Sequence, residues 1–175
     1  MVDPQFWTIF IPLLCAHVAG DFLLQTDAAV KRKRDVSVLL KHVLILSVLS
    51  YLLVGILGAW QLVVVIFISH ALIDTVKTRS NRNNLTVFLL DQCVHVLILI
   101  LTAYLVVRWQ LYPLEGVWLQ WLGTAYLDGL ILFTGAVSCI YVGGFVVAYR
   151  VAPSPEKLEG SEPRTGEREG GVEAP

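Results

Sequence analysis

The chain carries five long apolar runs, and these constrain its fold more than any other feature. A helix needs roughly 20 consecutive apolar residues to cross a bilayer. Runs of about this length fill 6–25, 37–57, 60–78, 86–107 and 125–149. Because lipid offers no hydrogen bonds to a backbone, such segments span as helices and not as open strands. The sequence therefore predicts an all-α, polytopic integral membrane protein with five transmembrane helices.

The composition agrees with a membrane protein. Only 15% of the 175 residues are charged and the mean hydropathy is +0.69, whereas a soluble domain has roughly 25% charged residues. The net charge of −1 gives no basic surface for nucleic acid, so no nucleic-acid partner is expected. Cys15, Cys93 and Cys139 lie inside apolar runs without metal-ligand spacing, which predicts packing residues.

The basic residues predict an orientation. Twelve of the thirteen lysines and arginines fall on one side of the five-helix arrangement, and only Arg108 falls on the other. Positive charge marks the cytoplasmic side, so the N-terminus is expected outside and the C-terminus inside. The tryptophans are expected at the outer boundary, where amphipathic rings are favoured: Trp7, Trp60, Trp109, Trp118 and Trp121.

Two segments are not expected to span. Residues 109–123 are interrupted by Pro113 and Gly116, which predicts either a helix lying along the outer interface or an ordinary loop. Residues 151–175 are rich in Pro, Gly and Glu and should form a disordered cytoplasmic tail. The domain organisation is thus a transmembrane domain over 1–150 and a tail over 151–175.

The transmembrane domain contains an internal repeat. "HVLILSVLSYLLV" at 42–54 and "HVLILILTAYLVV" at 95–107 share eight of thirteen positions at an offset of 53. The same offset relates His17 to His70 and Asp21 to Asp74, so each copy reads H-x3-D-x20-H. The repeats, about 10–57 and 60–108, are predicted to be parallel helical hairpins.

The repeat brings ionisable groups to one depth. Residues four apart share a helix face, and alternating helices place all the groups about one to two turns inside the cytoplasmic ends. Asp91 breaks the repeat, since its counterpart is Val38, yet it is expected at the same level. The predicted cluster has seven members: His17, Asp21, His42, His70, Asp74, Asp91 and His95.

The cluster points to a metal site. Ionisable groups inside a membrane are unfavourable and usually functional. Imidazole and carboxylate together suit Zn, Mn, Fe or Ni, and seven groups suffice for two bridged metals, or for one metal with carboxylates that orient the histidines. Two other interpretations stay open at this point. The pairs can be interhelical hydrogen bonds that hold the bundle, or they can form a proton or ion pathway without bound metal.

Three further polar residues are predicted to lie around the cluster and support its members. Gln25 is expected one turn beyond Asp21 on the same helix face, and Gln92 points about 100° away from its neighbour Asp91. Lys77 is expected on the Asp74 side of its helix at the cytoplasmic edge, where it either holds a phosphate or extends its amine to the interface.

The motif resembles an uncharacterised family of bacterial inner-membrane proteins classed as a domain of unknown function. The resemblance covers roughly 10–105 and rests on "HVAGDFLLQTD", a lone histidine, "HALIDTVK" and "DQCVH". Its motif positions are His17, Asp21, Phe22, Gln25, His42, His70, Asp74, Asp91, Gln92 and His95. It implies a bacterial inner membrane but no activity. In character the chain is also similar to membrane-bound metal-dependent hydrolases, which are small helical proteins with intramembrane His and Asp.

The first functional expectation is a metal-dependent hydrolase that acts on a lipid or lipid-linked phosphoester at the cytoplasmic leaflet. The predicted catalytic residues are His42, as ligand or general base, and Asp91. A divalent-metal or proton transporter is the first alternative. The second is a non-enzymatic scaffold, with a homo-oligomer formed through Gly135, Gly143 and Gly144 of the fifth helix. Membrane lipids are the expected partners.

Overall fold

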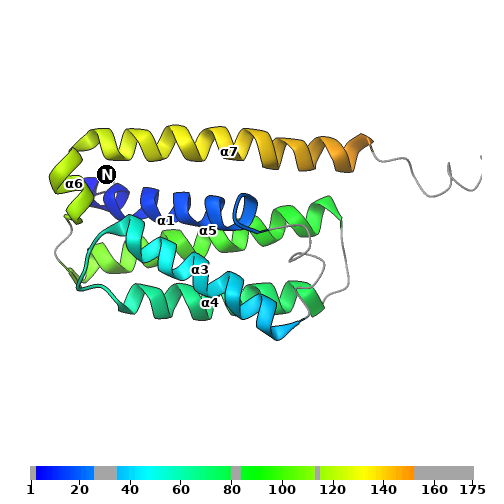
Figure 1. Ribbon diagram of the computed structural model, residues 1–175, viewed down its shortest axis with the longest axis horizontal. Coiled ribbons are helices and arrows are strands. Elements are labelled where there is room, and N and C mark those ends of the chain that lie inside the picture. Colours follow the sequence, from blue (N-terminus) through cyan, green and yellow to red (C-terminus); the bar gives the residue numbers. More distant parts are fainter. Residues whose placement is uncertain (1–2, 26–34, 80–83, 113–114, 152–175) are drawn as a thin grey trace, which may run out of the picture.

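A computed structural model describes residues 3–25, 35–79, 84–112 and 115–151 of the chain. Within these ranges the chain forms six helices and no strand (Figure 1). The helices are α1 (Pro4–Phe22), α3 (Val36–Val54), α4 (Gln61–Arg79), α5 (Leu85–Arg108), α6 (Val117–Leu122) and α7 (Thr124–Val151). The all-helical prediction is confirmed.

Local sequence signals set where the helices begin. The Asp3 carboxylate accepts a hydrogen bond from the Gln5 amide at 2.9 Å, just before Pro4 in the first turn of α1. Asp35 and Asn84 cap α3 and α5 in the same way. Such caps satisfy amide groups that have no partner within the helix.

The helices alternate in direction, so the bundle has two chemically different ends (Figure 1). The start of α1, the end of α3, the start of α4, the end of α5 and α6 lie together at the tryptophan end. All five tryptophans lie in or beside these segments: Trp7, Trp60, Trp109, Trp118 and Trp121. The opposite, basic end carries Lys41, Lys77, Arg79 and Arg150 among the described residues.

Four of the five predicted spans are long and apolar enough to cross a membrane: α3, α4, α5 and α7 as far as Ala148. The first helix, α1, is 19 residues long but includes Gln5, His17 and Asp21, which dilute its apolar character. A protein with four candidate spans is therefore established, and α1 as a fifth span stays a prediction, as does the repeat. The basic run at 31–34 and the tail from 152 lie outside the described residues.

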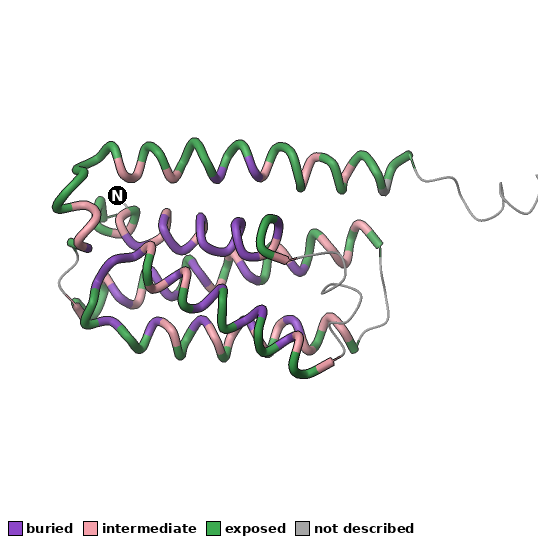
Figure 2. Tube along the Cα trace, viewed as in Figure 1, coloured by how far each residue is buried: buried purple, intermediate pink, exposed green. Residues whose placement is uncertain are grey.

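The apolar core fills the half of the bundle nearer the tryptophan end. Its fully buried members include Leu13 of α1, Leu46 of α3 and Ile66 of α4. By contrast α7 lies on the outside of the bundle and packs along α1 through Val137, while most of its length is exposed (Figure 2). Around Gly135, Gly143 and Gly144 no described atom would come within 4 Å of an added Cβ. The predicted oligomer contact at these glycines stays a prediction.

The segment 109–123, for which an interfacial helix or a loop was expected, contains the short helix α6. This helix and the start of α7 bind the end of α3. The Trp118 indole donates to the Leu52 carbonyl at 2.6 Å, and the Tyr126 hydroxyl donates to the Leu53 carbonyl. The last carbonyls of a helix have no partner within it, so these side chains complete α3.

Candidate metal centre

The seven predicted residues meet inside the bundle. α1 contributes His17 and Asp21, α3 contributes His42, α4 contributes His70 and Asp74, and α5 contributes Asp91 and His95. Each of their side chains is at most 8% exposed. Three overlapping groups of them have ligand atoms within 4.8 Å of one another: His17 with Asp21 and His70, His42 with His70 and Asp74, and Asp74 with Asp91 and His95.

The closest set joins α1, α3 and α4. Asp21 Oδ1 lies 3.2 Å from His42 Nε2 and 3.4 Å from His70 Nε2. Asp74 Oδ2 lies 3.8 Å from each of the same two nitrogens. Ligand atoms about 2.0–2.1 Å from a tetrahedral ion lie about 3.3 Å apart. The distances from Asp21 are close to this spacing, and His42, His70 and Asp74 form a group whose ligand atoms all lie within 4.8 Å of one another.

Gly20 allows this approach of α1 to α3. A Cβ at Gly20 would lie 2.8 Å from Leu46 Cδ1 and 3.3 Å from Leu46 Cβ, and Leu46 is fully buried. Any larger residue would push the helices apart next to Asp21, whose carboxylate must reach His42 across this contact.

The second set lies on α4 and α5. His95 Nδ1 donates a hydrogen bond to the Asp91 backbone carbonyl at 2.9 Å, so Nδ1 carries the ring proton. This tautomer leaves the Nε2 lone pair of His95 for the cluster, an arrangement typical of metal-binding histidines. The His95 ring lies 4.2 Å from that of His70 and stacks on that of His17 at 5.0 Å. The two sets are therefore continuous.

Several of the facing atoms are poorly satisfied. Asp21 Oδ1, His42 Nε2, His70 Nε2, Asp91 Oδ1 and His95 Nε2 are buried and have no well-angled hydrogen bond to a described residue. Most buried polar atoms in proteins are paired. Buried imidazole nitrogens and carboxylate oxygens that lie close together without hydrogen bonds are the kind of atoms that can bind an ion.

Charge gives the same indication. Among the described residues, the three carboxylates of the cluster lie with four imidazoles and one ammonium group, that of Lys77, which contacts Asp91. With neutral imidazoles the formal charge is −2, which a single divalent cation balances. Uncompensated charge is strongly unfavourable at buried positions, so a bound cation or two added protons would stabilise these groups.

The three predicted supporting residues occupy different places. The Lys77 ammonium contacts Asp91 Oδ2 at 2.5 Å, and the Gln92 amide donates to the same oxygen at 3.2 Å. From the sequence we expected Lys77 beside Asp74 and Gln92 pointing away from Asp91. In the structure both side chains reach Asp91, because both are long enough to do so. Helix α1 ends at Phe22, so Gln25 lies beyond it and not on the helix face with Asp21. Glycine and aspartate at 20 and 21 are weak helix formers, in keeping with this early end.

The cluster is closed toward the tryptophan end. On each of the four helices, the residue four positions from the histidine toward the tryptophan end is apolar and buried, and it lies on the same helix face. These residues form the apolar layer: Leu13, Leu46, Ile66 and Leu99, each at most 5% exposed. Sequence reasoning did not single them out, although the four-residue spacing from each histidine would have identified them.

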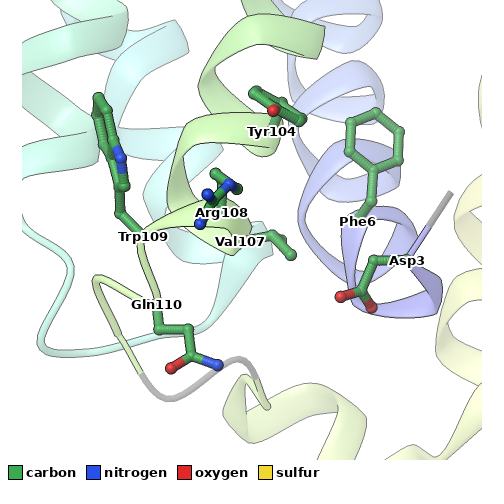
Figure 3. A pocket seen from close by; sticks show the side chains of 7 residues that line it. All are labelled: Asp3, Phe6, Tyr104, Val107, Arg108, Trp109 and Gln110. Atoms are coloured by element: carbon green, nitrogen blue, oxygen red, sulfur yellow. The ribbon is translucent and has the colours of Figure 1, made fainter.

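Two cavities lie near the bundle surface. One, of about 700 Å³, lies at the tryptophan end between the start of α1 and the end of α5, and its lining includes Asp3, Phe6, Tyr104 and Arg108 (Figure 3). None of the seven cluster residues lines it. The other, of about 500 Å³, lies between α4 and α5 and includes Lys77 and Asp91 in its lining. Only the second of these two adjoins the cluster.

The fold and the cluster define a helical membrane protein with buried histidines and aspartates that can hold a metal ion. The chain belongs to the family described as a protein of unknown function (DUF3307), whose model matches residues 9–116. The match includes all seven cluster residues and ends before α6 and α7. No curated protein and no solved structure matches the chain, so the expected likeness to hydrolases gains no support from these comparisons.

Proposed function

We propose that the protein is a metal-dependent hydrolase of the bacterial inner membrane that acts on a lipid or lipid-linked phosphoester. The observation that carries this proposal is the convergence of seven buried groups from four helices, whose ligand atoms form three overlapping groups and include buried atoms without hydrogen bonds. A purely structural cluster would be expected to pair these atoms with one another.

Within this proposal Asp21, His42, His70 and Asp74 hold a divalent ion. His95, His17 and Asp91 stand beside them, as ligands of a second ion or as groups that orient the first set. A divalent ion supplies a nucleophile at neutral pH, because it lowers the pKa of a water molecule that it binds. The donor set of imidazoles and carboxylates favours Zn, Mn, Fe or Ni.

Two residues have proposed catalytic roles. His42 is a ligand or a general base, and its Nε2 already faces both Asp21 and Asp74. Asp91 accepts a proton through Oδ1, while Lys77 and Gln92 hold Oδ2 and keep the carboxylate in place.

The proposed topology has α1 as a fifth span, the N-terminus outside and the C-terminus in the cytoplasm. The basic and tryptophan ends support it, since positive charge favours the cytoplasmic side and tryptophan favours the interface. The cluster then lies near the cytoplasmic leaflet, at the depth of lipid headgroup esters and phosphates.

The test of this function is hydrolysis of a phospholipid in mixed micelles by the purified protein, with released phosphate or headgroup measured. Asp74→Ala removes a carboxylate from both sets, and turnover should fall to background while the protein stays in the membrane fraction. Thr75→Ala is the matched control, because the Thr75 hydroxyl donates to the Ala71 carbonyl of its own helix. Turnover that survives Asp74→Ala would exclude this mechanism.

A transporter is the competing proposal, and the apolar layer disfavours it. An ion that crosses the bundle from the cluster would pass Leu13, Leu46, Ile66 and Leu99, which offer it no ligands. Coupled transporters also bind their ions near the midplane, whereas the cluster lies toward the basic end. Flux of Zn or Mn into proteoliposomes above that of empty liposomes would reverse this preference.

A further inference from the structure

The cavity between α4 and α5 is a groove on the outside of the bundle. Its apolar lining includes Leu72 and Val76 of α4 and Leu90 and Val94 of α5. These side chains are between 43% and 70% exposed. α7 lies along α1 on the opposite side of the bundle from α4 (Figure 1). The groove is therefore open to whatever surrounds α4 and α5, which in a membrane is lipid.

The polar end of the groove is also a wall of the metal centre. Asp91 Oδ2 contacts Lys77 on the groove side, whereas Asp91 Oδ1 lies 3.8 Å from His95 Nδ1 on the cluster side. One carboxylate thus separates the two spaces. The Lys77 side chain is 30% exposed, while that of Asp91 is 4% exposed, so the ammonium can be approached from the groove.

The two parts of the groove match the two parts of a phospholipid. The apolar side chains suit an acyl chain, because they already face hydrocarbon. Lys77 lies in the last turn of α4, at the depth where a phosphate group would sit, and a lysine ammonium pairs well with phosphate. A soluble phosphate compound would match the lysine but not the apolar lining.

We propose that a phospholipid binds sideways between α4 and α5, with an acyl chain against Leu72, Val76 and Val94 and its phosphate on Lys77. The Lys77 ammonium, which has three donors, then contacts the phosphate as well as Asp91, and the scissile group lies beside the cluster. This second part rests on the proposed function; the binding of lipid in the groove does not.

The experiment uses the full-length protein in phospholipid nanodiscs that contain phosphatidic acid with a photoactivatable diazirine in one acyl chain. After illumination, cross-linked residues are identified by mass spectrometry. Cross-links should concentrate on the groove residues of α4 and α5. Val94→Trp fills the groove and should reduce them at least tenfold. Leu101→Trp is the matched control, because Leu101 is an exposed residue of α5 outside the groove lining, and it should leave them unchanged.

A second pair of variants tests the headgroup contact. Lys77→Met should reduce labelling by phosphatidic acid severalfold but not labelling by a diazirine diacylglycerol, which lacks phosphate. Lys77→Arg should restore it. Labelling spread evenly over α3, α4, α5 and α7, or equal in Val94→Trp and Leu101→Trp, would overturn the proposal.

Metal content measured on the same samples separates the two proposals. Groove labelling without bound metal would leave the lipid site standing and remove the hydrolase. Stoichiometric metal without groove labelling would overturn the lipid site and leave the hydrolase proposal standing.

Discussion

At the scale of single residues, Asp91 and Lys77 show what the sequence could and could not predict. The level of each group followed from helical spacing, because four-residue intervals fix both depth and face. The pairing of Lys77 with Asp91 did not follow, since it depends on which helices lie side by side and on how far a flexible side chain reaches. Gln92 reaches Asp91 for the same reason.

Gly20 gives a prediction at this scale. Helix propensity favours Ala over Gly by about 1 kcal/mol, but an added methyl at residue 20 meets buried Leu46. Gly20→Ala should therefore lower the free energy of unfolding by about 1–3 kcal/mol and weaken metal binding at Asp21. Gly135→Ala, with open space around it, should be neutral or stabilising. Thermal or steric-trap unfolding in detergent measures both, and equal effects at the two positions would contradict the account.

At the scale of helices, the apolar runs predicted the positions of α3, α4, α5 and α7 to within two or three residues. Two features were harder to predict from the sequence: the early end of α1 at Phe22 and the division of 109–123 into a turn and α6. Both depend on tertiary contacts: the packing of α1 against α3 at Gly20, and the hydrogen bonds that bring α6 to the end of α3.

The hydrogen bond from Trp118 to Leu52 gives the prediction at this scale. Trp118→Phe removes the indole donor and leaves a helix-terminal carbonyl without its partner. It should lower the free energy of unfolding by about 1 kcal/mol. Trp121→Phe is the matched control, because Trp121 lies in the same helix and is 79% exposed, and it should change little. If the two variants had the same free energy of unfolding, the hydrogen bond from Trp118 would not stabilise the end of α3.

At the scale of the whole molecule, charge and aromatic residues divide the bundle into two ends, and the seven-residue cluster lies toward the basic one. The apolar layer then separates the centre from the tryptophan end. A buried polar cluster near one end of the bundle, with an apolar layer on its other side, favours the proposed hydrolase over a transporter.

Topology is the prediction at this scale. Green fluorescent protein fused after residue 151 should fluoresce, and alkaline phosphatase fused there should be inactive, because that end is expected in the cytoplasm. Fusions after residue 112 should give the opposite pattern. If both patterns were reversed, the cluster would face the outer leaflet and the proposed access from the cytoplasmic side would be wrong.

The central claim is that the seven-residue cluster binds metal, and elemental analysis of the detergent-purified protein tests it most directly. The wild-type protein should contain one or two equivalents of Zn, Mn, Fe or Ni, and a His17→Ala/His70→Ala double variant that remains folded should contain almost none. Absence of metal from the wild-type protein after reconstitution with each of the four ions would contradict the claim. The cluster would then be a proton path or a set of contacts that holds the helices together.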